Sequence, residues 1–335
     1  MKIGFTMDFR NVNGEPWRDF WEDRLWLMIE AEAMGFDYLL VQEHFFLPDG
    51  YGPSVPIFLA LLAERTKTAR IGSYTYVLPL HHAAQLAQET AVLDHLSQGR
   101  LDVCVGAGHR PAEYEAWGLR RQTRPSRMEE GLDVLKLAWT QRPFSYQGRY
   151  YDLKDITVAP EPFQKPHPPL WVAATSAAAA ERAGRHGAHL HGASVDPDFY
   201  AAYFRGLAES GKDEAQARIS NPWSITVTSE NPEAVWERNK QLYFHRWDFY
   251  RTIRAGMGDQ EIKYGLPPAE GYRDNELIGD ADSVLETLRR FVEALPITDI
   301  VHSGPAGGIP IREEAYPSLK AFAEKVLPEL KRWKS

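Results

Sequence analysis

Apolar and polar residues alternate along the chain with two different spacings. In short segments the apolar residues alternate with polar ones or run together, which predicts strands, and in longer segments they recur every three or four residues, which predicts helices. The clearest unit is a predicted helix over 82–98, which ends at Gly99 and passes into a predicted strand over 101–106. A helix that leads into a strand in this way is one half of a repeating βαβ unit.

This unit recurs along the chain. Strands are predicted at 3–7, 38–42, 71–78, 101–106, 170–174, 188–192, 222–228 and 299–302. Helices are predicted at 17–35, 57–67, 82–98, 127–140, 177–186, 199–209, 232–247 and 282–295, and again after 315. Eight strands, each followed by a helix with no break in composition, predict a (β/α)8 barrel that forms a single domain over 1–335. A doubly wound sheet, the main alternative, usually has fewer strands and a phosphate loop after the first one.

Two segments interrupt the barrel pattern, one after the fourth predicted strand and one after the seventh. Residues 144–169 hold two short aromatic strand-like pieces followed by a series of prolines, and residues 251–277 are rich in glycine and proline without any period. Long loops in compact domains are usually functional or disordered. We therefore expect the aromatic residues of 144–151 to form a wall of the substrate site, and 251–277 to form its lid.

Composition narrows the function classes. The chain has 335 residues, of which 44% are apolar, enough for a full core, and its net charge of −8 argues against nucleic acid or an anionic membrane as partner. A single cysteine, Cys104, excludes an internal disulfide and a cysteine-based metal site. No signal peptide is visible, and no apolar run approaches the roughly 20 residues of a membrane span. These features predict a soluble cytoplasmic protein.

Candidate chemistry gathers where predicted strands end, because ligands of such barrels bind at the carboxyl ends of the strands. His44 follows the second strand and has a side chain suited to proton transfer, although a lone histidine there is often structural. The loop Gly106–His109 follows the fourth strand. Thr175, Ser176 and Ala177 open a helix after the fifth, where a cap and free N–H groups offer a seat for a phosphate.

Other motifs carry less weight. The glycines at 106 and 108 lack the third glycine of a dinucleotide loop. His189 and His191 share one strand face without a carboxylate nearby in sequence, so we expect them to be structural, and no metal site is predicted. His81 and His82 are expected to serve the turn into the next helix.

Three stretches resemble the bacterial luciferase-like flavin-dependent oxidoreductases: LDHLSQGRLDVCVGAG at 93–108, GSYTYVLPLHH at 72–82, and Glu43-His44. The resemblance implies a two-component monooxygenase in which a separate reductase supplies reduced FMN. Oxygen would add to the flavin, and the flavin peroxide would oxidise a small organic substrate. It also implies a homodimer packed through the second and third helices, with Phe58, Leu61 and Leu62 among the apolar residues available for the contact.

The same resemblance implies roles for individual residues. His44 would lie beside the flavin as an acid, a base or a hydrogen-bond donor. A cis peptide bond at Tyr74–Thr75 would lie under the flavin ring, and the turn at 175–177 would bind its phosphate. Gly106 and Ala107 stand where the luciferases proper have cysteine and arginine, so His109 and Arg110 are expected to supply positive charge instead.

Several alternatives stay open at this point. A relative that transfers hydride with the deazaflavin F420 would use the same barrel position, and a flavin-binding relative without turnover is a further reading. A metal-dependent barrel hydrolase is permitted by eleven histidines but supported by no ligand spacing. If His44 is only structural, the acid or base is expected at His109, Tyr74 or His302.

Overall fold

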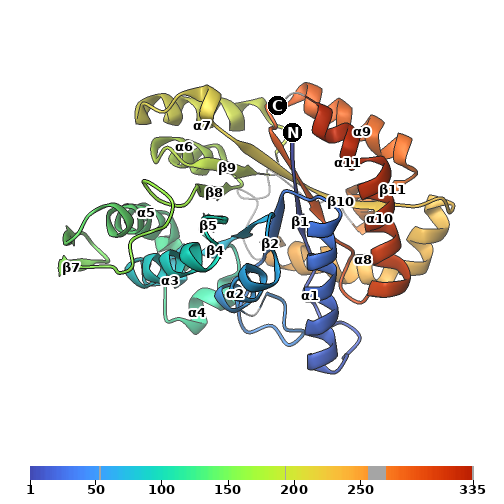
Figure 1. The fold of residues 1–335 in the computed structure, drawn as a ribbon, viewed down its shortest axis with the longest axis horizontal. Helices are drawn as coiled ribbons and strands as arrows, with labels where there is room; N and C mark the ends of the chain where they lie inside the picture. The colour runs from blue at the N-terminus through green and yellow to red at the C-terminus, as the bar shows by residue number, and fades with distance from the viewer. Residues whose placement is uncertain (53, 193, 256–268, 334–335) are drawn as a thin grey trace.

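Parallel strands close into a barrel at the centre of the structure, a computed structural model that describes residues 1–52, 54–192, 194–255 and 269–333 (Figure 1). Within these residues the barrel has eight strands, and its order is β12-β1-β2-β3-β5-β8-β9-β10, with β10 returning to β12. The ring closes where β10 pairs with β9, at Ile219 opposite Leu190. The barrel strands are β1 (Lys2–Thr6), β2 (Tyr38–Val41), β3 (Arg70–Ser73), β5 (Leu101–Gly106), β8 (Leu170–Ala174), β9 (His189–Gly192), β10 (Ile219–Val227) and β12 (Asp299–Ser303).

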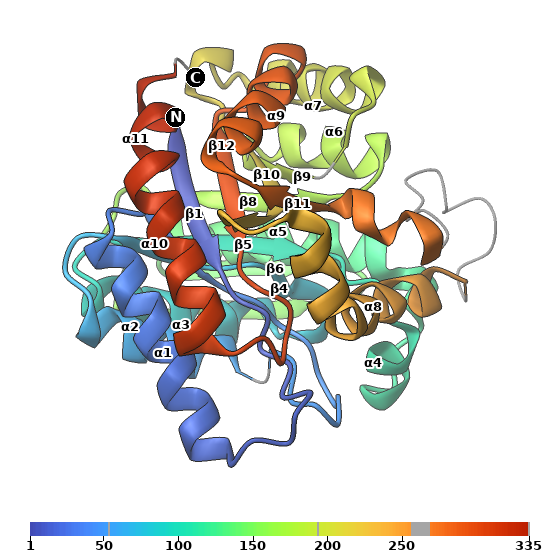
Figure 2. The ribbon, with the colours of Figure 1, turned by 90° about the vertical axis from the view of Figure 1, so that its right-hand side faces the viewer.

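Helices surround the barrel on the outside, as Figures 1 and 2 show. They are α1 (Trp17–Ala33), α2 (Val55–Arg65), α3 (Ala83–Leu96), α4 (Pro111–Ala116), α5 (Arg124–Thr140), α6 (Ala177–Arg185), α7 (Pro197–Ser210), α8 (Pro232–Ala255), α9 (Ala281–Ala294), α10 (Tyr316–Lys325) and α11 (Leu327–Arg332). Among the described helices none combines the length and the apolar character that crossing a membrane requires. The (β/α)8 prediction and its eight strands are confirmed.

Four short strands lie outside the ring or extend it. The predicted strand over 71–78 is divided, because Tyr74–Thr75 separates β3 from β4 (Tyr76–Val77), which pairs with β5. The strand β11 (Glu276–Gly279) adds to the outer edge of β10 and was not predicted, since it is short and lies in a segment without a period. The strands β6 (Phe144–Gln147) and β7 (Asp152–Ile156) form a separate hairpin.

The structure describes the first insertion fully and the second only in part. Both follow the strands predicted for them, the fourth and seventh of the barrel. The β6–β7 hairpin packs on the helices outside the barrel, with Tyr150 bonded to Ser126 of α5 and Tyr151 against His82 before α3. These contacts do not test the expectation that its aromatic residues form a wall of the substrate site, which stays a prediction. Residues 256–268 of the predicted lid lie outside the described residues.

Ion pairs fill the amino ends of the barrel interior. Arg70 pairs with Asp102 of β5, and Arg218, just before β10, pairs with Asp299 of β12. The indole N–H of Trp171 also donates to Asp102, over 3.1 Å. Buried carboxylates that are paired and hydrogen-bonded avoid the large cost of an isolated buried charge. The amino end is thereby closed by polar groups that have partners. Barrel enzymes carry out their chemistry at the opposite end, where the strands have their carboxyl ends.

Glycine permits the close contact between α6 and α7. A Cβ atom added to Gly206 would lie well inside van der Waals distance of the Glu181 carbonyl oxygen, which is backbone and has little freedom to move. We therefore expect Gly206→Ala to lower the free energy of unfolding by about 1–3 kcal/mol, the usual range for overpacking.

Gly118→Ala is the matched control for this prediction. Gly118 has a φ of +67° but no heavy atom within 4 Å of an added Cβ, so alanine there carries backbone strain without a clash. Chemical denaturation of both variants would compare the two costs. Unchanged stability in Gly206→Ala would mean that the approach of α6 to α7 does not require glycine.

Candidate functional site

The predicted site residues meet at the carboxyl ends of the barrel strands. His44 follows β2, Tyr74 and Thr75 lie between β3 and β4, Gly106 ends β5 with Ala107 and His109 after it, and Thr175, Ser176 and Ala177 follow β8. The ring centroids of His44 and His109 are 5.5 Å apart, and the two rings meet edge to face. This end of the barrel, here called the mouth, is where enzymes of this architecture bind their ligands.

His44 is buried and held by a carboxylate. Its Nδ1 lies 3.0 Å from Oε1 of Glu113, and its ring stacks on Tyr51 with centroids 4.6 Å apart. The same Glu113 oxygen accepts a hydrogen bond from the backbone N–H of Phe45, over 3.0 Å. Because a carboxylate only accepts, Nδ1 carries the proton in this pair. The other nitrogen, Nε2, is then an acceptor in the neutral ring.

Glu113 was not identified from the sequence. It lies in the six-residue helix α4, which the apolar spacing did not predict, and its side chain is only 1% exposed. Its second oxygen, Oε2, has no hydrogen-bond partner among the described residues. The only local signal for Glu113 was its position as an acidic residue shortly after the loop Gly106–Arg110. Its contact with His44 joins residues 69 positions apart, and such a contact cannot be predicted from the spacing of residues along the chain.

The neighbouring residue Glu43 forms a second carboxylate–imidazole pair. It accepts hydrogen bonds from His81 Nε2, over 2.9 Å, and from the backbone N–H of Val77, over 2.7 Å. Burial alone would lower the pKa of His81, but the pairing with Glu43 outweighs it and raises the pKa. His82 is the residue at which α3 begins. The turn role expected for these two histidines is confirmed, and it fixes the end of β2 against β4.

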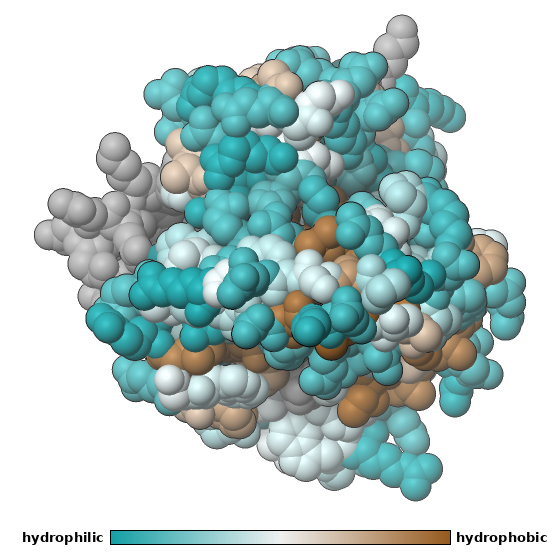
Figure 3. All heavy atoms as spheres, turned by 90° about the vertical axis from the view of Figure 1, so that its left-hand side faces the viewer, coloured by the Kyte–Doolittle hydropathy of each residue, from teal (hydrophilic) through white to brown (hydrophobic). Residues whose placement is uncertain are grey.

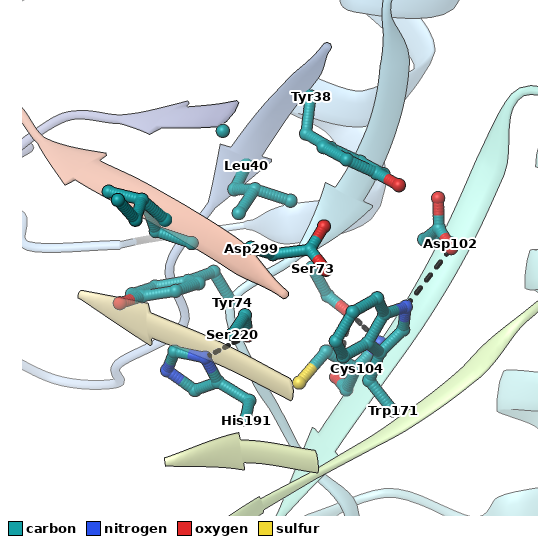
Figure 4. A pocket seen from close by; sticks show the side chains of 13 residues that line it. Tyr38, Leu40, Ser73, Tyr74, Asp102, Cys104, Trp171, His191, Ser220 and Asp299 are labelled. Atoms are coloured by element: carbon teal, nitrogen blue, oxygen red, sulfur yellow. Dashed lines mark hydrogen bonds between the residues drawn. The ribbon is translucent and has the colours of Figure 1, made fainter. Parts of the chain in front are cut away.

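Tyr74, Thr75 and Gly106 lie together under the mouth. The Tyr74–Thr75 peptide bond is cis, as the resemblance predicted. An added Cβ at Gly106 would lie 2.8 Å from the Thr75 hydroxyl, so glycine permits this approach. The Tyr74 ring lies 4.6 Å from that of His191, whose Nδ1 is bonded to Ser220. Figure 4 shows Tyr74 and His191 side by side in the barrel, among residues that line a cavity of about 30 Å³.

Ser176 caps α6 at the rim of the mouth. Its hydroxyl accepts from the Ala179 N–H over 3.4 Å, and both Thr175 and Ser176 are exposed. The first N–H groups of a helix have no partner within the helix, and the helix dipole favours an anion there. The turn is therefore accessible to a phosphate from solvent.

Aromatic side chains occupy the space above His44. Phe249, near the end of α8, lies 5.4 Å from His44, and the hydroxyl groups of Tyr250 and Tyr51 are 2.7 Å apart. Arg10 lies over the Tyr51 ring at 3.8 Å. Ligand pockets usually have roughly 300–1,000 Å³, far more than the cavity below these rings. The polar groups of the mouth, the His44–Glu113 pair and the exposed turn at Ser176, suit a flavin.

Two other predictions can be compared with the structure. His302 does not lie at the mouth: its ring contacts Phe5, Phe36 and Phe322 on the outer side of the barrel wall. His302 is therefore not an alternative acid or base at the mouth, and His109 and Tyr74 are the two that are left. Within the described part of the chain, no group of three or more His, Cys, Asp or Glu side chains is arranged to hold a metal.

Comparison with known proteins gives relatives of two kinds. The oxygenase component of a flavin-dependent trigonelline monooxygenase from Acinetobacter baylyi is 26% identical over 291 residues, covering 82% of this chain and 81% of that protein. An F420-dependent glucose-6-phosphate dehydrogenase from Amycolatopsis mediterranei is 30% identical over 322 residues, covering 90% and 92%. The chain is thus similar both to a monooxygenase and to a dehydrogenase.

A solved structure supports the fold. The monooxygenase RslO1 from Streptomyces bottropensis superposes with a TM-score of 0.85 at 24% identity, covering 98% of this chain and 99% of that one. The family model described as luciferase-like monooxygenase matches residues 5–298. Most of the barrel, including every predicted site residue, lies in that range, and the chain belongs to the luciferase-like monooxygenase family.

Proposed function

We propose that this protein is the oxygenase of a two-component flavin-dependent monooxygenase, which uses reduced FMN and O2 to oxidise a small organic substrate. The observation that carries the proposal is the buried His44–Glu113 pair at the mouth. When bound, FMN supplies the oxygen chemistry, and the protein supplies orientation, proton transfer and exclusion of water. A separate flavin reductase is the partner that this role requires.

His44 is the proposed catalytic residue. With Nδ1 held by Glu113, its Nε2 is available to take a proton from the substrate, or to donate one once the ring is doubly protonated. Glu113 acts through His44 as a positioning residue, because it fixes the tautomer and the rotation of the ring. The aromatic rings of Tyr51 and Phe249 both pack against the imidazole and shield it from water.

The cofactor is proposed to lie with its phosphate on Ser176 at the start of α6 and its ring over Tyr74, Thr75 and Gly106. Ala107 and His109 would line the same side of the ring, and Thr175 and Ala177 the phosphate. The relative that uses F420 makes hydride transfer the second candidate function. Absorption spectra of the protein loaded with each cofactor would distinguish the two, since only one should bind tightly.

A homodimer is proposed through the outer surface of α2 and α3. Phe58 and Leu62 are buried within the monomer and are not available, which corrects two of the residues expected at this contact. Leu61, by contrast, is 39% exposed, and Ile57 and Leu96 are 63% and 57% exposed. Figure 3 shows one face of the molecule, on which apolar areas lie between polar ones. Exposed apolar residues that gather on one face are typical of an interface.

The phosphate position predicts the effect of an added charge. Ser176→Asp keeps a capping oxygen but places a negative charge at the proposed seat, and we expect FMN affinity to fall by at least about 1.5 kcal/mol, the lower value for a lost hydrogen bond to a charged group. Fluorescence titration with FMN measures it. Asn231→Asp, which adds the same charge at the exposed start of α8, is the control and should leave the affinity unchanged. Unchanged affinity in Ser176→Asp would place the phosphate elsewhere.

The His44–Glu113 pair predicts two linked results. His44→Asn should lower product formation by about 10²–10⁴, the usual contribution of a positioned acid or base. Glu113→Gln should lower it less, by up to about 10², because His44 remains but an amide can donate to Nδ1 as well as accept. Single-turnover reactions of the FMNH2-loaded protein in air, with product measured against hydrogen peroxide released, give both values.

A structural readout separates positioning from simple destabilisation. NMR of ¹⁵N-labelled histidine should show the Nδ1–H tautomer of His44 in the wild type and a mixture in Glu113→Gln. Glu113→Asp, which keeps the carboxylate, should restore part of the activity. Full product yield in a folded His44→Asn variant would mean that His44 is structural, and would direct attention to His109 or Tyr74.

The dimer surface predicts a change in mass. Leu96→Glu places a charge among exposed apolar residues of α2 and α3 and should produce a monomer at concentrations where the wild type is a dimer. Val195→Glu changes a residue that is 69% exposed just before α7, and serves as the control. Light scattering during size-exclusion chromatography measures both. A wild-type monomer would remove the proposed dimer altogether.

A further inference from the structure

A second cavity lies outside the barrel wall. It has a volume of about 330 Å³ and is enclosed by β10, β12, α8 and α10, which Figure 2 shows on the side facing the viewer. Fully buried apolar residues, among them Phe5, Leu27 and Leu319, form its inner end. The volume reaches the range of ligand pockets, roughly 300–1,000 Å³.

His302 projects into this cavity from β12. Its ring contacts Phe5 and Phe36 outside the barrel, and it lines this cavity and not the one inside the barrel, so His302 faces outward. His302 is 2% exposed, and its ring centroid lies 4.8 Å from that of Phe322. Burial lowers the pKa of His302 to about 4, so the ring is neutral near pH 7, with one N–H donor and one acceptor. Neither ring nitrogen has a hydrogen-bond partner among the described residues.

Tyr243 of α8 lines the same cavity. It is 1% exposed, and its ring stacks on Trp236 with centroids 5.2 Å apart. Its hydroxyl also has no hydrogen-bond partner in the described part of the chain. The Thr226 side chain lies close to the Tyr243 hydroxyl, and backbone groups lie close to the His302 ring. Neither contact has the geometry of a hydrogen bond. Buried polar groups are rarely left without partners, because each one costs stability.

The charges at the rim restrict what can enter. Exposed acidic side chains outnumber basic ones there: Glu230, Glu313 and Asp280 against Arg238 and Lys325, with the half-buried Glu314 adding a further acid. Arg238 is already bonded to Glu230 and Glu314. A carboxylate or phosphate would be repelled at this rim, and a cation would have to leave water for a largely apolar interior, which is costly.

We propose that this cavity is a second binding site, for a small uncharged molecule with an apolar body and one hydroxyl group. A hydroxyl group both donates and accepts, so it has the chemistry to pair with either His302 or Tyr243. The apolar body covers the inner end of the cavity. The site does not depend on the flavin chemistry proposed for the mouth.

Calorimetric titration of the full chain with p-cresol tests the proposal. We expect one molecule to bind per chain, with the same affinity in the presence and absence of saturating FMN. Toluene lacks the hydroxyl, and p-toluate and 4-methylbenzylamine carry opposite charges on the same body. All three should bind at least three- to tenfold more weakly, which is the value of about one hydrogen bond.

Two variants assign the binding to this cavity. His302→Phe and Tyr243→Phe keep the aromatic ring and remove only the polar atoms, so each should weaken p-cresol three- to tenfold without lowering the melting temperature. Tyr203→Phe is the control, because its hydroxyl donates to the Ala188 carbonyl over 2.9 Å. It should lower the melting temperature and leave p-cresol binding unchanged.

Four outcomes would overturn the proposal. These are equal binding of toluene and p-cresol, full affinity in both variants, displacement of p-cresol by FMN, and no binding up to the solubility limit of p-cresol. The last outcome would mean a cavity filled by water alone, for which the volume allows about ten molecules at roughly 30 Å³ each. If one variant does not fold, the other alone decides.

Discussion

The buried guanidinium of Arg246 is the constraint on which the shape of the mouth depends. From α8 it reaches Asp8 beyond β1, over 3.2 Å, Ser224 of β10, over 2.7 Å, and the Gly304 carbonyl after β12, over 2.8 Å. Glu276 of β11 lies 3.5 Å away. A buried charge that lost one of these partners would be strongly destabilising. The ends of four strands and one helix are therefore held in a single arrangement.

That arrangement connects the barrel to the chemistry proposed for it. Since Arg246 fixes α8 against the strand ends, the last turns of α8 bring Phe249 and Tyr250 over His44. Below them, Glu43 and His44 each form a carboxylate–imidazole pair, one with His81 and one with Glu113. Adjacent residues of an extended chain point to opposite sides, so the two pairs hold the end of β2 from both sides. A catalytic group supported in this way keeps its orientation before any ligand arrives.

Buried polar atoms without hydrogen-bond partners occur at several positions among the described residues, including Thr6, Arg24 and Tyr76, and some of them lie at the two proposed sites. At the amino end of the barrel, Asp102 and Asp299 are buried and fully paired. Glu113 at the mouth has one buried oxygen without a described partner, and His302 and Tyr243 have theirs in the outer cavity. Proteins give up stability of this kind mainly where binding requires it. The same physical argument therefore applies to the proposed active site and to the proposed second site.

Periodicity by itself determined the architecture of this protein. The alternation of spacings predicted all eight barrel strands and both insertions, and the strand over 170–174 matches β8 residue for residue. Local patterns carry this information because backbone hydrogen bonding and burial of one face act on neighbouring residues. The six-residue α4 and four-residue β11 were missed, since segments so short show no period.

Their places after predicted strands indicated His44 and the turn at Ser176, and the family resemblance added the cis bond at Tyr74–Thr75 and a role for each. Only the tertiary structure decided what surrounds them. Glu113 lies 69 positions from His44, and Arg246 lies 238 positions from Asp8. Such pairs leave no local signal, because each depends on how separate strands close into one ring. Closure also turned His302 away from the mouth and buried Phe58 and Leu62, since the direction of a side chain follows from the register of the whole barrel.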